Sequence, residues 1–124
     1  MYNRESNLNN KPRYNLFKNW SYALNGLRIT FKNEISFKLE ILAAIPLLIL
    51  IYVVDFDYIE KTILLATMFL TLIVELLNSA VENVVDITTK EYNSLAKNAK
   101  DMGAAAVFIS ISLHLVCWLI FYFN

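Results

Sequence analysis

Three long apolar segments restrict what this chain can fold into. They cover residues 35–54, 62–85 and 102–123 of a 124-residue chain that is 57% hydrophobic. A bilayer needs about 20 apolar residues in a helix, and only helices and closed barrels satisfy their backbone hydrogen bonds in lipid. The first segment is free of charge only from Ile41 onward, so its helix must begin in the preceding polar residues. We therefore predict a single all-α integral-membrane domain with three transmembrane helices.

The charged residues between these segments predict an orientation. Most of the 11 basic residues precede the first span or lie between the second and third, where Lys90, Lys97 and Lys100 are found. The loop "DFDYIEK" between the first two spans is acidic. Because positive loops stay in the cytoplasm, we expect a cytoplasmic N-terminus and an outside C-terminus. Since the basic residues follow membrane topology, nucleic-acid binding has no support.

A further helix is expected ahead of the first span, over residues 15–33. Its apolar residues are spaced by four, four, three and four positions and form one helical stripe: Leu16, Trp20, Leu24, Leu27 and Phe31. A basic amphipathic helix of this kind is typical of the membrane interface. Packing on the bundle as a structural helix is the alternative. The polar residues 1–13 are expected to be mobile.

The second span carries a row of polar residues on one helical face. At about 100° per residue, the members fall within about 60° on either side of one line. We call Glu75, Asn78, Ser79, Glu82 and Asp86 the polar row. Charges inside a span cost a few kcal/mol each and are expected to have a function. Interhelical hydrogen bonding, pumps, channels and transporters also remain open as explanations of this row.

More polar groups follow on the same predicted membrane face. They are Glu91, Tyr92, Asn93, Lys100 and Asp101, while Glu34 and Glu40 lie near the start of the first span. Carboxylates beside a lysine suit Mg²⁺ that is shared with nucleotide phosphates. The sequence contains neither a Walker-type nor a kinase-type glycine loop. A phosphotransferase of this sequence would not belong to a common soluble class.

These residues occur in a recognisable pattern. "ELLNSAVENVVD", followed by "EY" and "AKDMGAAAV", resembles the signature region of the prokaryotic diacylglycerol kinase family. Upstream, "NGLRITFKNEISFKLE" resembles the family's entry into its first span, so the likeness runs from about Tyr22 to the C-terminus. The resemblance implies an ATP-dependent kinase of a membrane lipid alcohol in the bacterial inner membrane. It also implies a homotrimer with active sites shared between subunits.

The resemblance assigns roles by position. Glu75 matches the general base, and Glu34 and Glu82 match the carboxylates that hold Mg²⁺ with ATP. The positions that match nucleotide contacts are Tyr22, Glu34, Glu82, Glu91, Tyr92, Asn93, Lys100 and Asp101. The positions that match the lipid side are Arg28, Glu40, Glu75, Asn78 and Ala104, and Asp86 lines the same site.

The sequence departs from the family pattern at the nucleotide end. Asn93 stands where a histidine is expected, Lys97 and Asn98 replace an expected Gly-Arg, and Leu24 stands where tryptophan is common. Diacylglycerol is the expected substrate, and undecaprenol, used by another branch of the family, is the alternative. A small ion or proton carrier is the non-catalytic alternative. We interpret His114, alone in the third span, as a helix-packing or lumen-facing residue and not a ligand.

Self-association is expected on physical grounds too. A three-span chain has little interior in which to hide Glu75, Asn78, Glu82 and Asp86 from lipid. Small residues that favour close helix approach open the third span: Gly103, Ala104, Ala105, Ala106 and Ser110. We therefore expect a closed homo-oligomer in which Glu75 and Glu82 face a neighbouring subunit.

Overall fold

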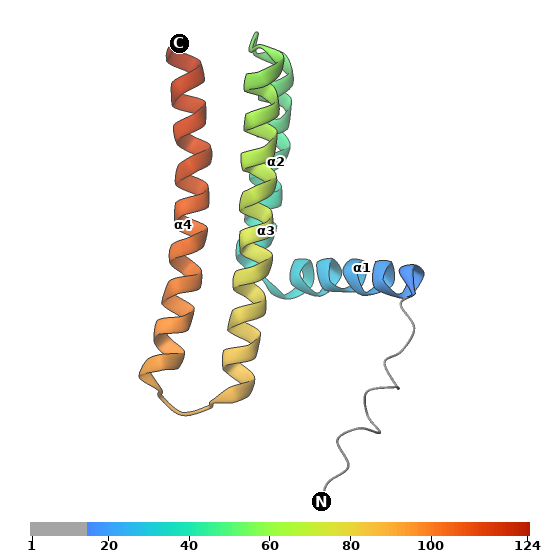
Figure 1. Cartoon of the computed structure of the whole chain (residues 1–124), viewed down its shortest axis with the longest axis vertical. Helices are drawn as coiled ribbons and strands as arrows, with labels where there is room; N and C mark the ends of the chain where they lie inside the picture. Colours follow the sequence, from blue (N-terminus) through green and yellow to red (C-terminus); the bar gives the residue numbers. More distant parts are fainter. Residues whose placement is uncertain (1–14) are drawn as a thin grey trace, which may run out of the picture.

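The computed structural model describes residues 15–124, which form four helices and contain no strand (Figure 1). The helices are α1 (Leu16–Asn33), α2 (Ile35–Val53), α3 (Tyr58–Thr88) and α4 (Ser94–Phe123). The all-α prediction is confirmed for this part of the chain. The predicted mobility of residues 1–13 lies outside the described residues.

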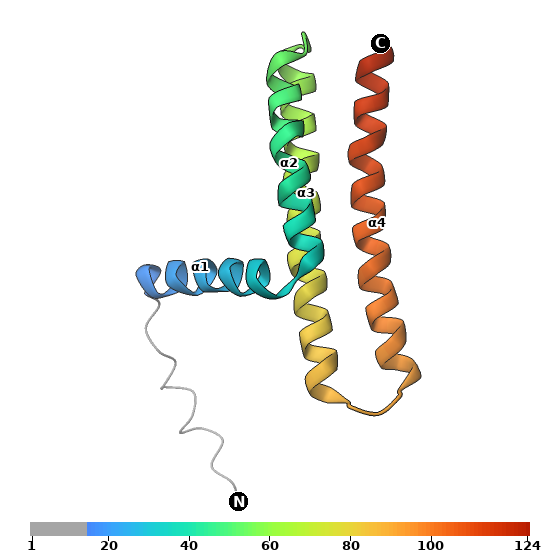
Figure 2. The ribbon, with the colours of Figure 1, turned by 180° about the vertical axis from the view of Figure 1, so that it is seen from behind.

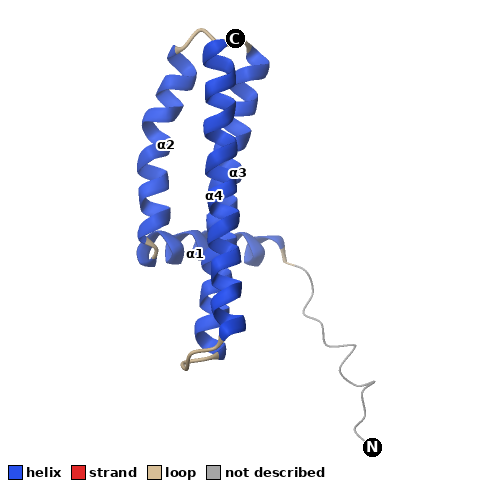
Figure 3. Cartoon of the chain, turned by 90° about the vertical axis from the view of Figure 1, so that its left-hand side faces the viewer, coloured by secondary structure: helices blue, strands red, loops and turns tan. Residues whose placement is uncertain are grey.

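Three of the helices run side by side, and α1 extends sideways from them (Figures 1 and 2). Within residues 15–124, α2 and α4 both pack on α3 but not on each other. The side view places α2 and α4 against different sides of α3 (Figure 3). The helix with the polar row is therefore the corner of an L-shaped bundle.

Each of the helices α2, α3 and α4 is long enough to cross a membrane and contains an apolar 18-residue segment, and the mean hydropathies of these segments are 2.0, 2.0 and 2.3. The 31 residues of α3 span about 46 Å at 1.5 Å per residue, which exceeds the roughly 30 Å hydrocarbon core of a bilayer. The joined ends of α3 and α4 extend past the level of α1 (Figures 1 and 2). These ends have the length to reach beyond the lipid.

Helices α3 and α4 are longer than the predicted spans of 62–85 and 102–123. Helix α3 begins at a capping box, in which the Glu60 amide donates to Asp57 Oδ1 over 2.8 Å and the Asp57 amide donates to Glu60 Oε2 over 3.0 Å. Helix α4 begins at a simpler cap, in which the Asn93 side chain accepts hydrogen bonds from backbone amides of the first turn. Hydropathy marks the part of a helix that suits lipid, whereas caps determine where the helix begins.

The interior of the single chain is small. Leu64 is the one fully buried large side chain in the described part, and most large apolar side chains of the three spans are exposed. At the end of the bundle where α2 joins α3, the Phe56 ring packs edge-on against Trp118 and Phe121. The loop between α2 and α3 therefore packs against α4 through Phe56.

A buried series of hydrogen bonds also joins α3 to α4. The Trp118 indole N–H donates to His114 Nε2 over 3.1 Å, so Nε2 carries no proton. The Nδ1–H of a neutral imidazole then donates to Thr67 Oγ1 over 2.8 Å. The Thr67 hydroxyl in turn donates to the Ile63 and Leu64 carbonyls. His114 thus has the helix-packing role expected from the sequence.

Candidate active site

Four carboxylates converge where α1, α2 and α3 meet. Glu75 is only 4% exposed. Glu34 and Glu82 lie close enough for their charges to act on Glu75, and Glu75 lies close enough for its charge to act on Glu40. The Ser36 side chain lies beside the Glu75 carboxylate. Since Glu34 is the junction residue between α1 and α2, this cluster sits at the level of α1.

The burial of Glu75 corrects one expectation. We expected the chain to need a neighbouring subunit to remove Glu75 from lipid, but this side chain is already buried within one chain. Burial then decreases along the polar row. Ser79 is buried, Asn78 and Glu82 are half-buried, and the Asp86 side chain is 65% exposed. The row therefore leads from a buried carboxylate to an exposed one.

Asn78 connects α3 to α4 in the middle of this row. Its Nδ2 donates to Glu82 Oε1 over 3.3 Å, while its Oδ1 is buried and has no hydrogen-bond partner within residues 15–124. Gly103 of α4 faces that oxygen, and a Cβ at position 103 would collide with it. The sequence predicted Gly103 only as a small packing residue. A glycine in an otherwise alanine-rich helical turn is the signal that could have revealed this close approach.

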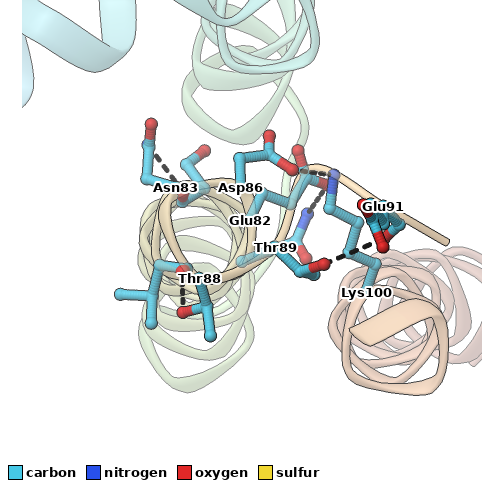
Figure 4. Close-up of polar contacts among 10 residues, drawn as sticks. Glu82, Asn83, Asp86, Thr88, Thr89, Glu91 and Lys100 are labelled. Atoms are coloured by element: carbon cyan, nitrogen blue, oxygen red, sulfur yellow. Dashed lines mark hydrogen bonds and ion pairs between the residues drawn. The ribbon is translucent and has the colours of Figure 1, made fainter. Parts of the chain in front are cut away.

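A polar cavity of about 270 Å³ lies at the joined ends of α3 and α4. It is lined by charged and polar residues that the sequence grouped, among them Asp86, Glu91, Tyr92, Asn93, Lys97, Lys100 and Asp101. Lys100 Nζ contacts Asp86 Oδ1 at 2.6 Å across the two helices (Figure 4). Lys97 Nζ contacts Asp101 Oδ2 at 2.5 Å within α4. The structure therefore brings this part of the predicted site together in one place.

Two lysines and three carboxylates line this cavity. The Asp86 carboxylate, which accepts a hydrogen bond from Lys100, raises the pKa of this ammonium above its usual value. Lys100 precedes the apolar part of α4 and stays protonated at neutral pH. Lys97, a departure from the family pattern, lines the same cavity and adds a second ammonium. Both lysines are paired within the chain, Lys100 with Asp86 and Lys97 with Asp101, so a bound anion would compete with these carboxylates for the two ammonium groups.

Asn93 has a structural role that the sequence did not predict. Its Oδ1 accepts hydrogen bonds from the backbone amides of Leu95 and Ala96, at 2.9 and 3.2 Å. Asn93 is therefore the N-cap of α4. Its side-chain oxygen is already engaged, which leaves its amide N–H groups for a ligand in the cavity.

Three predicted site residues do not join these clusters in the single chain. Tyr22 is 65% exposed, and Arg28 and Ala104 are also exposed. Tyr22 and Arg28 lie on α1, which extends away from the bundle (Figure 2). Tyr92, although it lines the polar cavity, is 85% exposed. In a single chain, the predicted site residues of α1 therefore do not contact the rest of the predicted site.

The carboxylates fit one type of metal site. Within residues 15–124, no group of three or more His, Cys, Asp or Glu side chains is arranged to hold a metal ion. Mg²⁺ is commonly bound through one or two carboxylates together with substrate phosphates. Glu34 and Glu82, which both lie near Glu75, match that arrangement. The donor set suits a metal that arrives with a phosphate ligand and not a metal held by protein alone.

These features describe a helical protein with three candidate membrane spans, an acidic centre at the level of α1 and a lysine-containing cavity at the joined ends of α3 and α4. The family model "Prokaryotic diacylglycerol kinase" matches residues 21–122. The chain belongs to this family, and it is an enzyme of the kinase class.

The chain is also similar in sequence to curated proteins over most of their length. The chain is 39% identical to "Diacylglycerol kinase" of Escherichia coli K12 over 105 residues, which are 85% of this chain and 86% of the relative. It is 39% identical to "Diacylglycerol kinase" of Pseudomonas aeruginosa PAO1, over 78% and 79% of the two chains. It is 35% identical to "Diacylglycerol kinase" of Helicobacter pylori 26695, over 83% and 80%.

Proposed function

We propose that this enzyme transfers the γ-phosphoryl group of ATP to diacylglycerol and so makes phosphatidic acid at the cytoplasmic membrane face. The observation that carries the proposal is the position of two sites on one helix. A buried carboxylate centre lies at the level of α1, and a charged cavity lies at the end of α3 that extends beyond it. The first suits a lipid hydroxyl, and the second suits a soluble nucleotide.

Glu75 is the proposed general base. It accepts the proton of the lipid's primary hydroxyl as that oxygen attacks the γ-phosphorus. Its burial at the meeting point of α1, α2 and α3 supports this role, because a general base must be held in a fixed position within hydrogen-bond reach of the proton that it accepts. The Ser36 side chain beside it helps to fix its orientation.

The charged residues have complementary roles in phosphate binding. Glu34 and Glu82 would hold Mg²⁺ together with ATP, and the bound ion would neutralise phosphate charge during transfer. Lys100 and Lys97 place positive charge in the cavity where the nucleotide is proposed to bind. Asp86 fixes the Lys100 ammonium through their 2.6 Å contact. Positioning and charge neutralisation supply most of the catalysis in phosphoryl transfer.

The same proposal sets the orientation in the membrane. The N-terminus and the connection between α3 and α4 are cytoplasmic, and the protein resides in the bacterial inner membrane. Helix α1 lies in the interface, with its exposed apolar side chains, such as Trp20 at 69% and Phe31 at 50%, against the lipid. Tyr22 and Arg28 of α1 contact the nucleotide and the lipid in the assembled enzyme, which we propose to be a homotrimer.

The direct test is phosphoryl transfer by the purified protein in mixed micelles. The protein would receive radiolabelled ATP and Mg²⁺ with diacylglycerol in one reaction and undecaprenol in another. Labelled phosphatidic acid is the expected product, and it should disappear when EDTA is added. Labelling of undecaprenol alone would assign the enzyme to the other substrate branch. A proton or ion flux with no labelled lipid would contradict the kinase proposal.

A further inference from the structure

Helices α1 and α2 are separated by a single residue, Glu34, whose backbone is extended with φ −97° and ψ 116°. At this residue the chain turns from α1, which extends sideways, into the bundle (Figure 2). The Glu34 side chain lies close enough to Glu75 for its charge to act on it. The contacts that hold this turn therefore also determine where the Glu34 carboxylate lies in the acidic centre.

The backbone contributes little to the shape of this turn. The segment "FKNEISFK" contains neither a glycine nor a proline, so no residue there extends or restricts the allowed backbone angles. The Glu34 amide closes α1 by donating to the Thr30 carbonyl over 2.8 Å, but the Lys38 amide lies 3.4 Å from the Glu34 carbonyl. The Glu34 side chain does not cap α2. The geometry of the turn therefore depends on other side-chain contacts.

Lys38 supplies such a contact across the turn. Its Nζ donates to the Lys32 carbonyl over 2.9 Å. This carbonyl is one of the last four of α1, which have no partner inside their own helix, and a cation favours the negative end of a helix dipole. Lys38 therefore caps the C-terminal end of α1 although it belongs to α2.

The surroundings of Lys38 suit this role. Its side chain is half-buried, and the preceding Phe37, at 3% exposure, anchors this turn of α2 in the bundle interior. Lys38 belongs to neither of the ion pairs found within residues 15–124, so its ammonium is not engaged by a carboxylate there. A lysine in the first turn of α2 opposes the dipole of that helix. Its charge therefore stabilises the end of α1 and not its own helix.

We propose that Lys38 is a positioning residue that fixes the turn between α1 and α2 and thereby holds the Glu34 carboxylate where Mg²⁺·ATP can bind. Lys38 acts through Glu34, and its ammonium does not touch the nucleotide or the lipid. Without this cap, the Glu34 carboxylate would occupy a wider range of positions, and the apparent Kd for Mg²⁺·ATP would rise as the productive position became less populated. The inference rests on the proposed function, because Glu34 is a ligand of Mg²⁺ only in that proposal.

Hydrogen exchange tests the cap without requiring turnover. Lys38→Met keeps the apolar stem of the side chain and removes its donor. Amides in a peptide that covers residues 30–36 should exchange several-fold faster in the full protein with this change, because the end of α1 opens more often. Lys32→Met is the matched control, because it removes a neighbouring exposed ammonium and keeps the backbone carbonyl that accepts the hydrogen bond. The control should leave the exchange rates unchanged.

Binding of Mg²⁺·ATP tests the consequence for Glu34. The apparent Kd, measured by titration without a lipid acceptor, should rise several-fold in Lys38→Met. Lys38→Gln, whose side chain is too short to span the turn, should give the same result, whereas Lys38→Arg keeps a long cationic donor and should restore wild-type exchange and binding. In a Glu34→Gln background, Lys38→Met should not change the Kd further, because the carboxylate that it positions is absent.

Three results would overturn the inference. Equal effects of Lys38→Met and Lys32→Met would reduce both to a loss of surface charge. Faster exchange with an unchanged Kd would limit Lys38 to stabilising α1. A raised Kd with unchanged exchange, or one that persists in the Glu34→Gln background, would mean that Lys38 contacts the ligand itself. Failure of the wild-type protein to bind Mg²⁺·ATP would instead contradict the proposed function, and the inference with it.

Discussion

At the scale of single residues, the members of the polar row differ in how deeply they are buried. Glu75 and Ser79 are buried, whereas the Asp86 side chain is 65% exposed and paired with Lys100. Periodicity could place all five members on one face, because that depends on spacing alone. It could not grade their burial, because burial depends on how α2 and α4 pack against α3. The row therefore contains groups suited to different tasks.

Glu82→Gln tests the proposed metal position. Glutamine keeps an oxygen that can accept the hydrogen bond from Asn78 Nδ2, but it removes the charge that would bind Mg²⁺. We expect weaker binding of Mg²⁺·ATP, measured by titration, and slower transfer, with the helical content and assembly of the protein preserved. Unchanged nucleotide affinity together with loss of the assembled protein would make Glu82 a structural residue.

Gly103→Ala tests the contact between α4 and Asn78. The new Cβ would collide with Asn78 Oδ1 and displace this side chain from Glu82, so turnover should fall by about tenfold or more. Gly26→Ala is the matched control, because a Cβ at Gly26 meets nothing within 4 Å. That change should leave turnover unaltered and stabilise α1 by up to about 1 kcal/mol.

A double-mutant cycle separates this effect from general damage to the helix pair. If Gly103→Ala acts by displacing Asn78, the variant that combines it with Asn78→Ala should be no slower than Asn78→Ala alone. Additive losses of turnover in the double variant would show that Gly103 acts through another contact.

At the scale of helices, the sequence predicted which segments suit a membrane better than where each helix ends. The apolar segments correspond to α2, to the inner part of α3 and to the C-terminal part of α4. The ends were missed because Asp57 and Asn93 cap helices in polar sequence, several residues before the apolar part begins. Asn93 also shows how a position assigned to nucleotide contact can act first as a cap.

Thr67→Val tests the hydrogen bonds through His114 that join α3 to α4. Valine removes the acceptor for the His114 Nδ1–H while keeping nearly the same shape. Buried hydrogen bonds between membrane helices contribute up to about 2 kcal/mol, so we expect a loss of about 1 kcal/mol in denaturant unfolding of the detergent-solubilised protein. Thr62→Val, on the exposed side of the same helix, is the control. Equal losses of unfolding free energy in both variants would show that the hydrogen bonds through His114 contribute no more than an exposed threonine does.

At the scale of the whole molecule, one chain forms only part of the predicted site. The sequence pattern assigned Tyr22 and Arg28 of α1 to the site, but α1 extends away from the bundle and both side chains are exposed. The apolar spacing within α1 predicts a helix, but it does not predict how this helix is oriented relative to α2 and α3. Glu75, by contrast, is already buried within one chain, so hiding this charge does not require assembly.

Subunit mixing tests whether the sites are shared. An inactive Glu75→Gln chain would be combined with an inactive chain altered on α1, such as Arg28→Ala. Some transfer activity should return, because a homotrimer with shared sites places an intact α1 against an intact Glu75 in part of the mixed assemblies. Failure to recover activity in verified mixed oligomers would mean that each site is built from one chain. A fully active monomer would contradict the assembly itself.

The buried Glu75 is proposed to accept the proton of the lipid hydroxyl, and single-turnover transfer by the Glu75→Gln variant measures this role. Radiolabelled Mg²⁺·ATP would be bound to the wild-type and variant enzymes at saturation, diacylglycerol would be added, and the rate of phosphatidic acid formation measured. General-base catalysis contributes about 10²–10⁴ in rate, so we expect at least about a 10²-fold slower transfer with ATP binding retained. A transfer rate within a few-fold of wild type would contradict the account.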